Sequence, residues 1–475
     1  MKKMSEEEKI NWLIDPKRFF PSNLSRGALC GNKNFINAVD TYLKILAESQ
    51  FWPLKRLEEI QVKRLRALTA CIADCSLFWS NYFREHGFSP DKAVLKDLIR
   101  LPILRRNNIL TLGASIYVNP RDEDYPLFTR RGSGTTGISL KLIYSEREFL
   151  IGWIPFLLRH PVFEKQSLVE LLSRKPFVVL GKPGMRYAFE KDFFYRTFEA
   201  IQSTDLELLE VRKNIYKSIY ETKPAILIGF GSLIAKLAQL ALQDNVTLPL
   251  MAVRVTSEPI SSLERALIHK AFQAPIINWL SGNGIGVLGF ECPTNEGNFH
   301  LNAENVVLET IISDGNTVRG NDKELIATSL AFTLTPIIRF AQEDLGQFIS
   351  KICPCGRTLP IFEFTGRRGY DVVLPSGNRI RMILLHSALM GLRSTHRKVK
   401  QIQVIQKTLD SINILIVRRA AFSDGDELAI RLAVSKLFGG EKMLIDIEYV
   451  EDIIPGRSHK PSFFVPLSEF QERKL

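Results

Sequence analysis

Between residues 177 and 280 the chain alternates short apolar runs with amphipathic stretches. The apolar runs have the length of β-strands and read FVVLG (177–181), AILIG (225–229), MAVRVT (251–256) and PIINWL (275–280). Segments with apolar residues three and four positions apart separate them, at 206–221, 232–243 and 261–272. Because successive parallel strands need a crossover, usually a helix, this alternation predicts an α/β domain with a largely parallel sheet. Ligands bind such sheets beyond the carboxyl ends of the strands.

The sequence patterns on either side of this region differ from it. Helical spacing from about 37 to 85, then an SPDK helix start ended by Pro102, predicts a helical lead-in over residues 1–115. Short strands and turns follow Asn283, and the last hundred residues hold strands around two helices (383–391 and 425–438). We therefore predict a large domain at 1–371, with mostly parallel sheets flanked by helices, and a small α+β domain at 372–475.

Composition excludes several classes. The chain has 475 residues and a net charge of +12, but its Lys and Arg are spread among Asp and Glu, which does not indicate nucleic-acid binding. No apolar run is suited to a membrane span. Acidic residues directly follow the lysines of MKKMSEEEK, so no secretory signal is expected and we predict a cytoplasmic protein. Six cysteines in so long a chain do not make a disulfide framework.

A loop of glycine and hydroxyl residues precedes the strand-like LKLIY. It consists of Gly132, Ser133, Gly134, Thr135, Thr136 and Gly137. Glycines let backbone N–H groups turn inward, and hydroxyls add donors, so such a loop suits phosphate. A hairpin turn of the same composition explains the loop equally well when it is taken alone.

The order of further motifs resembles the phenylacetate–coenzyme A ligase group of the adenylate-forming enzymes. The resemblance runs from about Ser76 to Phe464. It comprises LIRLPILRRNNI, GSGTTG, KPAILIGFGSLIAKLA, TSEP, GFEC, PIIRFAQEDLG, CPCGR and GRRGYD. Each motif is weak alone, whereas the ordered set is specific. The resemblance implies that ATP activates a carboxylic acid as an acyl adenylate, and that the acyl group then moves to the thiol of coenzyme A or of an acidic acyl carrier protein.

By this resemblance the glycine loop binds phosphate, with Thr136 among the catalytic residues, and Ser257 and Glu258 of TSEP lie along the adenine. A plain helix cap explains TSEP as well. Asp344 corresponds to the aspartate that accepts hydrogen bonds from the ribose hydroxyls, since a carboxylate offers two acceptors. Arg367 corresponds to the arginine near the ribose and phosphates.

The resemblance also assigns roles to two residues of the C-terminal region. Asp371 corresponds to the hinge about which a mobile small domain turns. Lys460 corresponds to the catalytic lysine that bridges the attacking carboxylate and the α-phosphate, a role suited to a point charge on a flexible stem. A solvated surface lysine, with Arg457 as the substitute, is the alternative. Trp153, Phe230 and Trp279 suggest an aryl or apolar acid, although core packing explains them too.

Three cysteines and a histidine form a second constellation. Cys292 and His300 are close in sequence, and Cys353 and Cys355 flank one proline. Three thiols and an imidazole are a closed tetrahedral set for zinc, and CPC pairs in cytoplasmic proteins are more often metal-binding than disulfide-forming. We expect a structural zinc ion, since four protein ligands leave no open position.

Two departures from the family pattern concern magnesium and the glycine loop. Ile138 and Ser139 stand where the family has Lys and Pro, with Lys141 nearest. WLSGNGIG (279–286) lacks the glutamate that helps to hold magnesium, and Asn283 keeps an oxygen ligand without the charge. A degenerate relative that binds nucleotide or acyl ligand without efficient adenylation is therefore the alternative function. A serine or cysteine hydrolase is disfavoured, because the chain has no GxSxG elbow.

Overall fold

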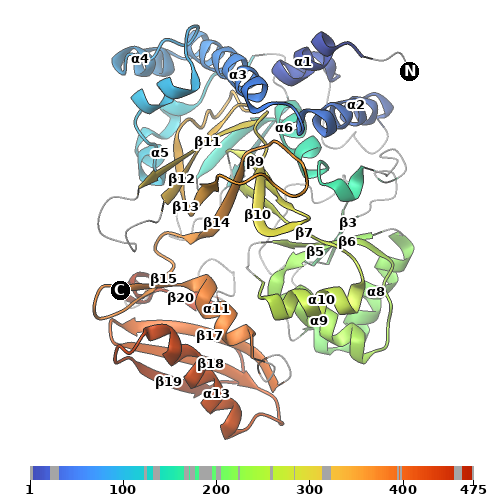
Figure 1. The fold of residues 1–475 in the computed structure, drawn as a ribbon, viewed down its shortest axis with the longest axis vertical. Helices are drawn as coiled ribbons and strands as arrows, with labels where there is room; N and C mark the ends of the chain where they lie inside the picture. Colours follow the sequence, from blue (N-terminus) through green and yellow to red (C-terminus); the bar gives the residue numbers. More distant parts are fainter. Residues whose placement is uncertain are drawn as a thin grey trace.

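The structure is a computed structural model. It describes residues 4–21, 32–121, 126–131, 140–164, 171, 177–180, 195–198, 205–222, 225–256, 260–282, 284–312, 323–392, 395, 398–453 and 463–472. Figure 1 shows helices of the N-terminal region above a central sheet, a lobe with a second sheet below it on one side, and the C-terminal region below it on the other. No helix in this part of the chain combines the length and apolar character that a membrane span requires.

The lead-in is helical, as predicted. Its α-helices are α1 (Glu6–Ile14), α2 (Lys33–Ser49), α3 (Leu54–Cys75), α4 (Leu77–Glu85) and α5 (Arg106–Leu112). Side-chain caps begin three of them: Ser5 and Ser76 accept from backbone N–H groups three residues ahead, and Asn32 does the same. The SPDK segment does not start an α-helix; a turn there leads into the 3₁₀-helix η3 (Leu95–Arg100), which ends before Pro102.

The alternating region folds into the predicted parallel sheet. Its strand order is β4-β3-β5-β6-β7, and every pairing is parallel. The strands are β3 (Phe177–Leu180), β4 (Tyr195–Phe198), β5 (Ala225–Phe230), β6 (Leu250–Thr256) and β7 (Ile276–Ile277). The helices are α8 (Leu209–Thr222), α9 (Gly231–Gln243) and α10 (Ser262–Phe272). The predicted α/β class is thereby confirmed.

The second sheet of the large part is antiparallel. Its order is β11-β12-β13-β14-β10-β9-β8. The strands are β8 (Trp279–Gly282), β9 (Gly286–Cys292), β10 (Asn295–Leu301), β11 (Val306–Ile312), β12 (Lys323–Ser329), β13 (Phe340–Ile349) and β14 (Ile361–Arg367). The predicted strand PIINWL is therefore divided between two sheets. Gly284 and Gly286 have positive φ, which lets the chain turn back sharply and pair β9 with β8.

A hairpin and a buried helix complete the large part. Strands β1 (Leu127–Arg131) and β2 (Lys141–Ser145) pair antiparallel, with Arg131 opposite Lys141, so the glycine loop joins two neighbouring strands. Helix α6 (Glu146–Leu157) follows directly and is buried along almost its whole length. It lies in the same apolar core as the lead-in helices and the antiparallel sheet.

The C-terminal region has its own apolar core, which runs from Val372 to Phe464. Its four-stranded sheet has the order β19-β18-β17-β20. The elements are β15 (Asp371–Val373), β16 (Arg379–Arg381), α11 (Met382–Met390), β17 (Val399–Thr408), β18 (Ser411–Arg418), α13 (Asp424–Ser435), β19 (Leu444–Tyr449), β20 (Phe464–Val465) and α14 (Leu467–Glu472). The helices predicted near 383–391 and 425–438 are thus confirmed within a few residues.

Candidate functional site

Many residues predicted at the nucleotide site lie outside the described residues. They are Gly132, Ser133, Gly134, Thr135, Thr136, Gly137, Ile138, Ser139, Ser257, Glu258, Asn283, Arg457 and Lys460. The described part of the predicted site consists of Asp344, Arg367 and Asp371, together with the side chains around them.

Asp344 and Arg367 face each other across two neighbouring strands. They are register partners on β13 and β14, and Arg367 Nε donates to Asp344 Oδ1 at 2.9 Å. The Asp344 side chain is 9% exposed and that of Arg367 is 43% exposed. Burial raises the pKa of Asp344 and the Arg367 charge opposes this rise, whereas the Asp344 charge raises the pKa of Arg367. The pair therefore joins a buried carboxylate to a cation that reaches the surface.

The backbone beside this pair resolves which of two neighbouring acids faces Arg367. Glu343 has a positive φ of 67°, and β13 bulges against β12 between Ala341 and Leu345. Such a bulge re-aims side chains. Arg367 consequently pairs with Asp344, while the Glu343 carbonyl accepts from the backbone N–H of Arg368 at 2.7 Å.

Further arginines surround the pair, and the motif interpretation had not assigned them a role. Arg105 donates two hydrogen bonds of 2.9 Å to the buried carboxylate of Glu324 on β12, and Arg368 lies 3.5 Å from the same group. Burial lowers the pKa of Arg106, the nearby charge of Glu343 opposes this effect, and that of Arg367 adds to it. In the sequence these arginines appear only as the doubled Arg of LPILRRNNI and GRRGYD. Such pairs are usually exposed surface residues, so the sequence alone did not mark them as part of a site.

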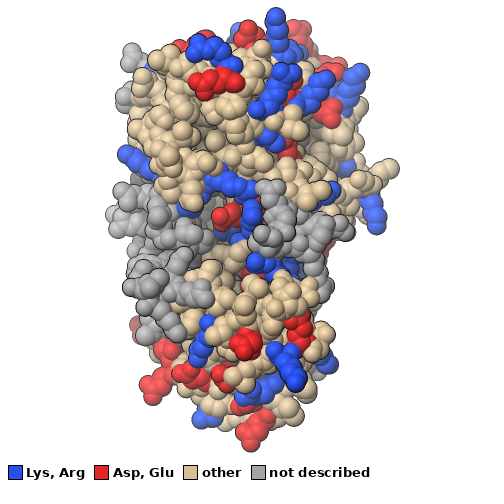
Figure 2. Space-filling model, turned by 90° about the vertical axis from the view of Figure 1, so that its left-hand side faces the viewer, with Lys and Arg blue, Asp and Glu red and all other residues tan. Residues whose placement is uncertain are grey.

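One face of the molecule has a charged hollow. Figure 2 shows Lys and Arg side chains, with acidic ones between them, in a hollow about halfway down the face that lies to the left in Figure 1. Strands β12 and β13 lie toward that side in Figure 1. The basic side chains in such a hollow favour the approach of anions.

Asp371 lies where the chain enters the C-terminal region. It is buried, begins β15 and is the register partner of Arg381 on β16. Arg381 Nη1 donates to the carbonyl of Thr365 on β14 at 3.3 Å. This contact ties the C-terminal region to the strand that carries Arg367.

Two further contacts connect the C-terminal region with the parallel-sheet lobe. Arg419, which follows β18, pairs with Glu207 at 2.5 Å, and Glu207 also binds Lys236 of α9. His386 Nε2 of α11 lies 4.0 Å from Glu264 Oε2 of α10. These polar pairs hold the observed arrangement of the two parts.

The three aromatic residues predicted to line an acid pocket do not share one environment. Trp153 and Trp279 are buried in the core that contains α6 and the antiparallel sheet, whereas Phe230 belongs to the core of the parallel-sheet helices. Cations lie over both indoles: the Arg130 guanidinium is 5.2 Å from the Trp153 ring and that of Arg254 is 4.2 Å from the Trp279 ring. Trp153 and Trp279 thus share one apolar core, and Phe230 belongs to another.

The predicted metal ligands converge. Cys292 ends β9, His300 lies on β10, and Cys353 and Cys355 lie in the connection from β13 to β14. Their ligand atoms all lie within 4.8 Å of one another. Cys292 Sγ is 3.3 Å from Cys353 Sγ, and Cys355 Sγ is 3.2 Å from His300 Nε2. Zinc bond lengths imply ligand separations of roughly 3.4–3.8 Å in a tetrahedron, so these donors fit the ion.

The environment of His300 suits a neutral ligand. Burial, chiefly, lowers the pKa of His300 to about 4, and its Nδ1 lies 3.5 Å from the carbonyl oxygen of Leu359. A metal-binding histidine commonly directs its second ring nitrogen to such a carbonyl. The four residues are thus a candidate metal-binding set that joins β9 and β10 to the connection between β13 and β14.

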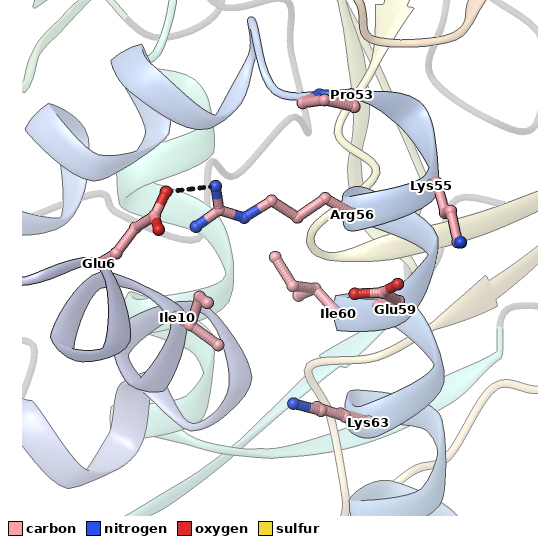
Figure 3. Close-up of a pocket in the computed structure, with 8 residues that line it drawn as sticks. All are labelled: Glu6, Ile10, Pro53, Lys55, Arg56, Glu59, Ile60 and Lys63. Atoms are coloured by element: carbon pink, nitrogen blue, oxygen red, sulfur yellow. Dashed lines mark hydrogen bonds and ion pairs between the residues drawn. The ribbon is translucent and has the colours of Figure 1, made fainter.

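A pocket at the N-terminal helices is separate from these sites. It has a volume of about 420 Å³ and lies between α1 and α3 (Figure 3). Its lining consists of Glu6, Ile10, Pro53, Lys55, Arg56, Glu59, Ile60 and Lys63. Arg56 pairs with Glu6 at 2.6 Å and stacks over the Trp52 ring, so the arginine is occupied structurally. No residue predicted for nucleotide, acid or metal lines this pocket.

Comparison with known proteins supports the family resemblance at the level of the fold. Residues 372–465 match the family model of the CapK C-terminal domain. Comparison with curated protein sequences finds no match. A crystal structure of 2-hydroxyisobutyryl-CoA ligase in the postadenylation state, in complex with R3-HIB-AMP, is similar with a TM-score of 0.68 and 14% identity, over 90% of this chain and 93% of that chain.

Two further structures extend the comparison. The same ligase in the thioesterfication state, with 2-HIB-AMP and CoA, aligns with a TM-score of 0.53 and 14% identity, over 88% of this chain and 92% of that one. Anthranilate CoA ligase AuaEII with anthranoyl-AMP aligns with a TM-score of 0.51 and 16% identity, over 73% and 65%. The chain therefore has the fold of the adenylate-forming CoA ligases.

Proposed function

We propose that the protein is an ATP-dependent acid–thiol ligase. A carboxylate oxygen of the acid attacks the α-phosphorus of ATP, the bond to the bridging oxygen breaks, and pyrophosphate leaves. The thiol sulfur of coenzyme A, or of a carrier-bound phosphopantetheine, then forms a bond to the acyl carbon, and AMP leaves. The observation that carries this proposal is the buried Asp344 paired with Arg367, in a chain that aligns with a CoA ligase over 90% of its length.

The residues of this chain have distinct roles in the proposed reaction. Asp344 accepts hydrogen bonds from the ribose hydroxyls, and Arg367 holds that carboxylate in place while presenting charge to the phosphates. The glycine loop 132–137 and Ser257 and Glu258 bind the rest of ATP. Lys460 supplies positive charge during adenylation. Asp371 is the hinge of a small domain at 372–475, with the large domain at 1–371.

Two metal ions enter the proposal differently. Zinc fits the donor set of Cys292, His300, Cys353 and Cys355 and would supply stability without taking part in the reaction. Magnesium would accompany ATP, but no carboxylate stands in the segment 279–286 where the family places its glutamate. No step is therefore assigned to a protein-bound magnesium ion.

The test is a panel of aryl and aliphatic acids assayed for ATP-dependent thioester formation, with coenzyme A and with a carrier protein in parallel. AMP and pyrophosphate should appear in equal amounts with the thioester. The missing carboxylate favours one alternative, a relative that binds nucleotide or acyl ligand without efficient adenylation. Saturable ATP binding without acid-dependent exchange of pyrophosphate into ATP, across the whole panel, would support that alternative.

A further inference from the structure

The charged cluster beside the candidate nucleotide site contains one arginine with a different environment from the others. Arg105 is bound to Glu324 and Arg367 to Asp344, each at 2.9 Å. Arg368 shares Glu324. Arg106 stands apart, because its Nε and Nη2 atoms are buried and have no hydrogen-bond partner among the residues that the structure describes.

An unsatisfied buried donor is costly, and more so when it carries charge. Burial lowers the pKa of Arg106; the charge of Glu343 acts in the opposite direction, and that of Arg367 adds to the lowering. The guanidinium is a fixed fork of donors that matches phosphate and carboxylate oxygens. A ligand anion would therefore satisfy Arg106 better than the described protein groups do.

The backbone places Arg106 beside the nucleotide site. Leu104 forms a parallel bridge with Phe340 at the start of β13, since its N–H donates to Arg339 and its carbonyl accepts from Ala341. Two residues further on, Arg106 begins α5, close enough to Glu343 and Arg367 for their charges to act on it.

The same lead-in also contacts β2, the strand that follows the glycine loop in the sequence. Beyond α5, the Tyr117 hydroxyl donates to the carbonyl of Lys141 at 2.7 Å. Lys141 begins β2, the strand that follows the loop. The segment from Leu104 to Tyr117 thus extends from the strand of Asp344 to the hairpin of the glycine loop, and Arg106 lies at its start.

We propose that Arg106 binds a phosphate group of the nucleotide held by Asp344 and Arg367. This inference rests on the proposed function and adds a phosphate-binding residue from the helical lead-in. The arginine would neutralise phosphate charge. The chain lacks the Lys and Pro that follow the glycine loop in the family, and it lacks the acidic residue expected in 279–286. The ligand is a nucleoside phosphate. The affinity for the nucleoside without phosphate should not depend on Arg106.

The test compares the affinities of the full chain for adenosine, AMP and ATP by calorimetry, without any acid or thiol present. Arg106→Ala should weaken ATP binding by about tenfold to hundredfold, the effect of losing a hydrogen bond to a charged group, and leave adenosine binding within about twofold. Arg106→Lys should recover part of the affinity, because it keeps the charge. The matched control is Arg100→Ala, which removes a 56%-exposed arginine from the same lead-in.

Each outcome bears on the inference. A loss for AMP equal to that for ATP assigns Arg106 to the α-phosphate, and a loss for ATP alone assigns it to the outer phosphates. Equal losses for adenosine and ATP, or unchanged ATP affinity, overturn the inference while the proposed function stands. A parent protein that binds neither adenosine nor ATP overturns both. Thermal unfolding of Arg106→Lys checks that the fold persists.

Discussion

Cys292 Sγ lies 3.3 Å from Cys353 Sγ, although the two residues are 61 positions apart in the chain. His300 and Cys355 complete the set. We expect protein purified without added zinc to contain about one zinc ion per chain by elemental analysis. Cys353→Ser should lose the ion and lower the free energy of unfolding by roughly 2–5 kcal/mol, since loss of a metal is among the largest single-residue effects.

Cys71 provides the control for this prediction. It is a free, half-buried cysteine of α3 outside the cluster, so Cys71→Ser should keep the ion. Metal-free parent protein with a Cys353→Ser variant of equal stability would contradict the zinc site.

Asp344 should distinguish nucleotides by their ribose hydroxyls. Asp344→Asn should weaken ATP binding about tenfold to hundredfold, because hydrogen bonds to a carboxylate are charge-assisted. The same substitution should scarcely change the weaker binding of 2′,3′-dideoxy-ATP, which has no diol. Calorimetry with both nucleotides provides the measurement, and Glu363→Gln, on the neighbouring strand β14, is the control. Equal losses for both nucleotides would refute a contact with the ribose.

The pH dependence of ATP binding follows from the same carboxylate. Burial raises the pKa of Asp344 above its ordinary value of 3.8. Protonation removes acceptor capacity, so affinity should fall on acidification at a higher pH than for an exposed aspartate. For folding the sign is opposite: a raised folded-state pKa favours the protonated fold, so ionisation of Asp344 costs stability as the pH rises through that pKa. Asp344→Asn should remove both dependences.

Substitution of Lys460 should affect the two half-reactions differently. Lys460→Ala should abolish formation of the acyl adenylate, because the charge that stabilises the transition state is lost, and should spare thioester formation from supplied acyl adenylate. Lys442→Ala, an exposed lysine of the same C-terminal region, is the control. Equal loss of both half-reactions would count against the assignment.

Glu304 and Arg159 form a buried ion pair with two hydrogen bonds, of 2.7 and 2.8 Å, and Ser49 also donates to the carboxylate. Glu304→Gln should lower the free energy of unfolding by about 3–5 kcal/mol, since it leaves the guanidinium buried without its counter-charge. Chemical denaturation measures this loss. Glu296→Gln, with a 72%-exposed side chain, should change stability little.

Acidification should lower the stability of the parent protein through the ion pair of Glu304 and Arg159. Burial alone would raise the pKa of Glu304, but Arg159 and Ser49 together hold it below its ordinary value of 4.5. A lowered folded-state pKa contributes stability above the unfolded-state value, and this contribution is lost as the pH falls below about 4.5. The loss should be absent from Glu304→Gln.

The contact of Arg419 with Glu207 should bias the arrangement of the C-terminal region. Arg419→Ala should shift the population away from the observed arrangement by up to about fivefold, the range for a partly exposed ion pair. Distances between fluorescent labels on α9 and α13 would report the shift. Arg418→Ala is the neighbouring control, since Arg418 stacks on Tyr449 within the same region. Identical distance distributions for both variants and the parent would exclude this role.

The sequence by itself determined the α/β class and the positions of most helices and strands of the parallel-sheet lobe. Periodicity is a local property, and apolar runs such as 225–229 and 251–256 agree with the fold around them. The ordered motifs also indicated the fold that the structural comparison finds. The local sequence pattern could not show that 275–280 is divided between two sheets, because strand pairing depends on residues far away in the sequence.

Only the tertiary structure decided which charged and sulfur-bearing side chains meet. The register of β13 against β14 makes Asp344, and not Glu343, the partner of Arg367, and the strand connections bring Cys292 to Cys353. Phe230 belongs to a different apolar core from Trp153 and Trp279, because it ends β5 and caps α9. Arg106 carries no distinguishing local signal, and its position depends on the bridge between Leu104 and Phe340. Contacts between residues far apart in sequence follow from topology, and a local pattern does not encode topology.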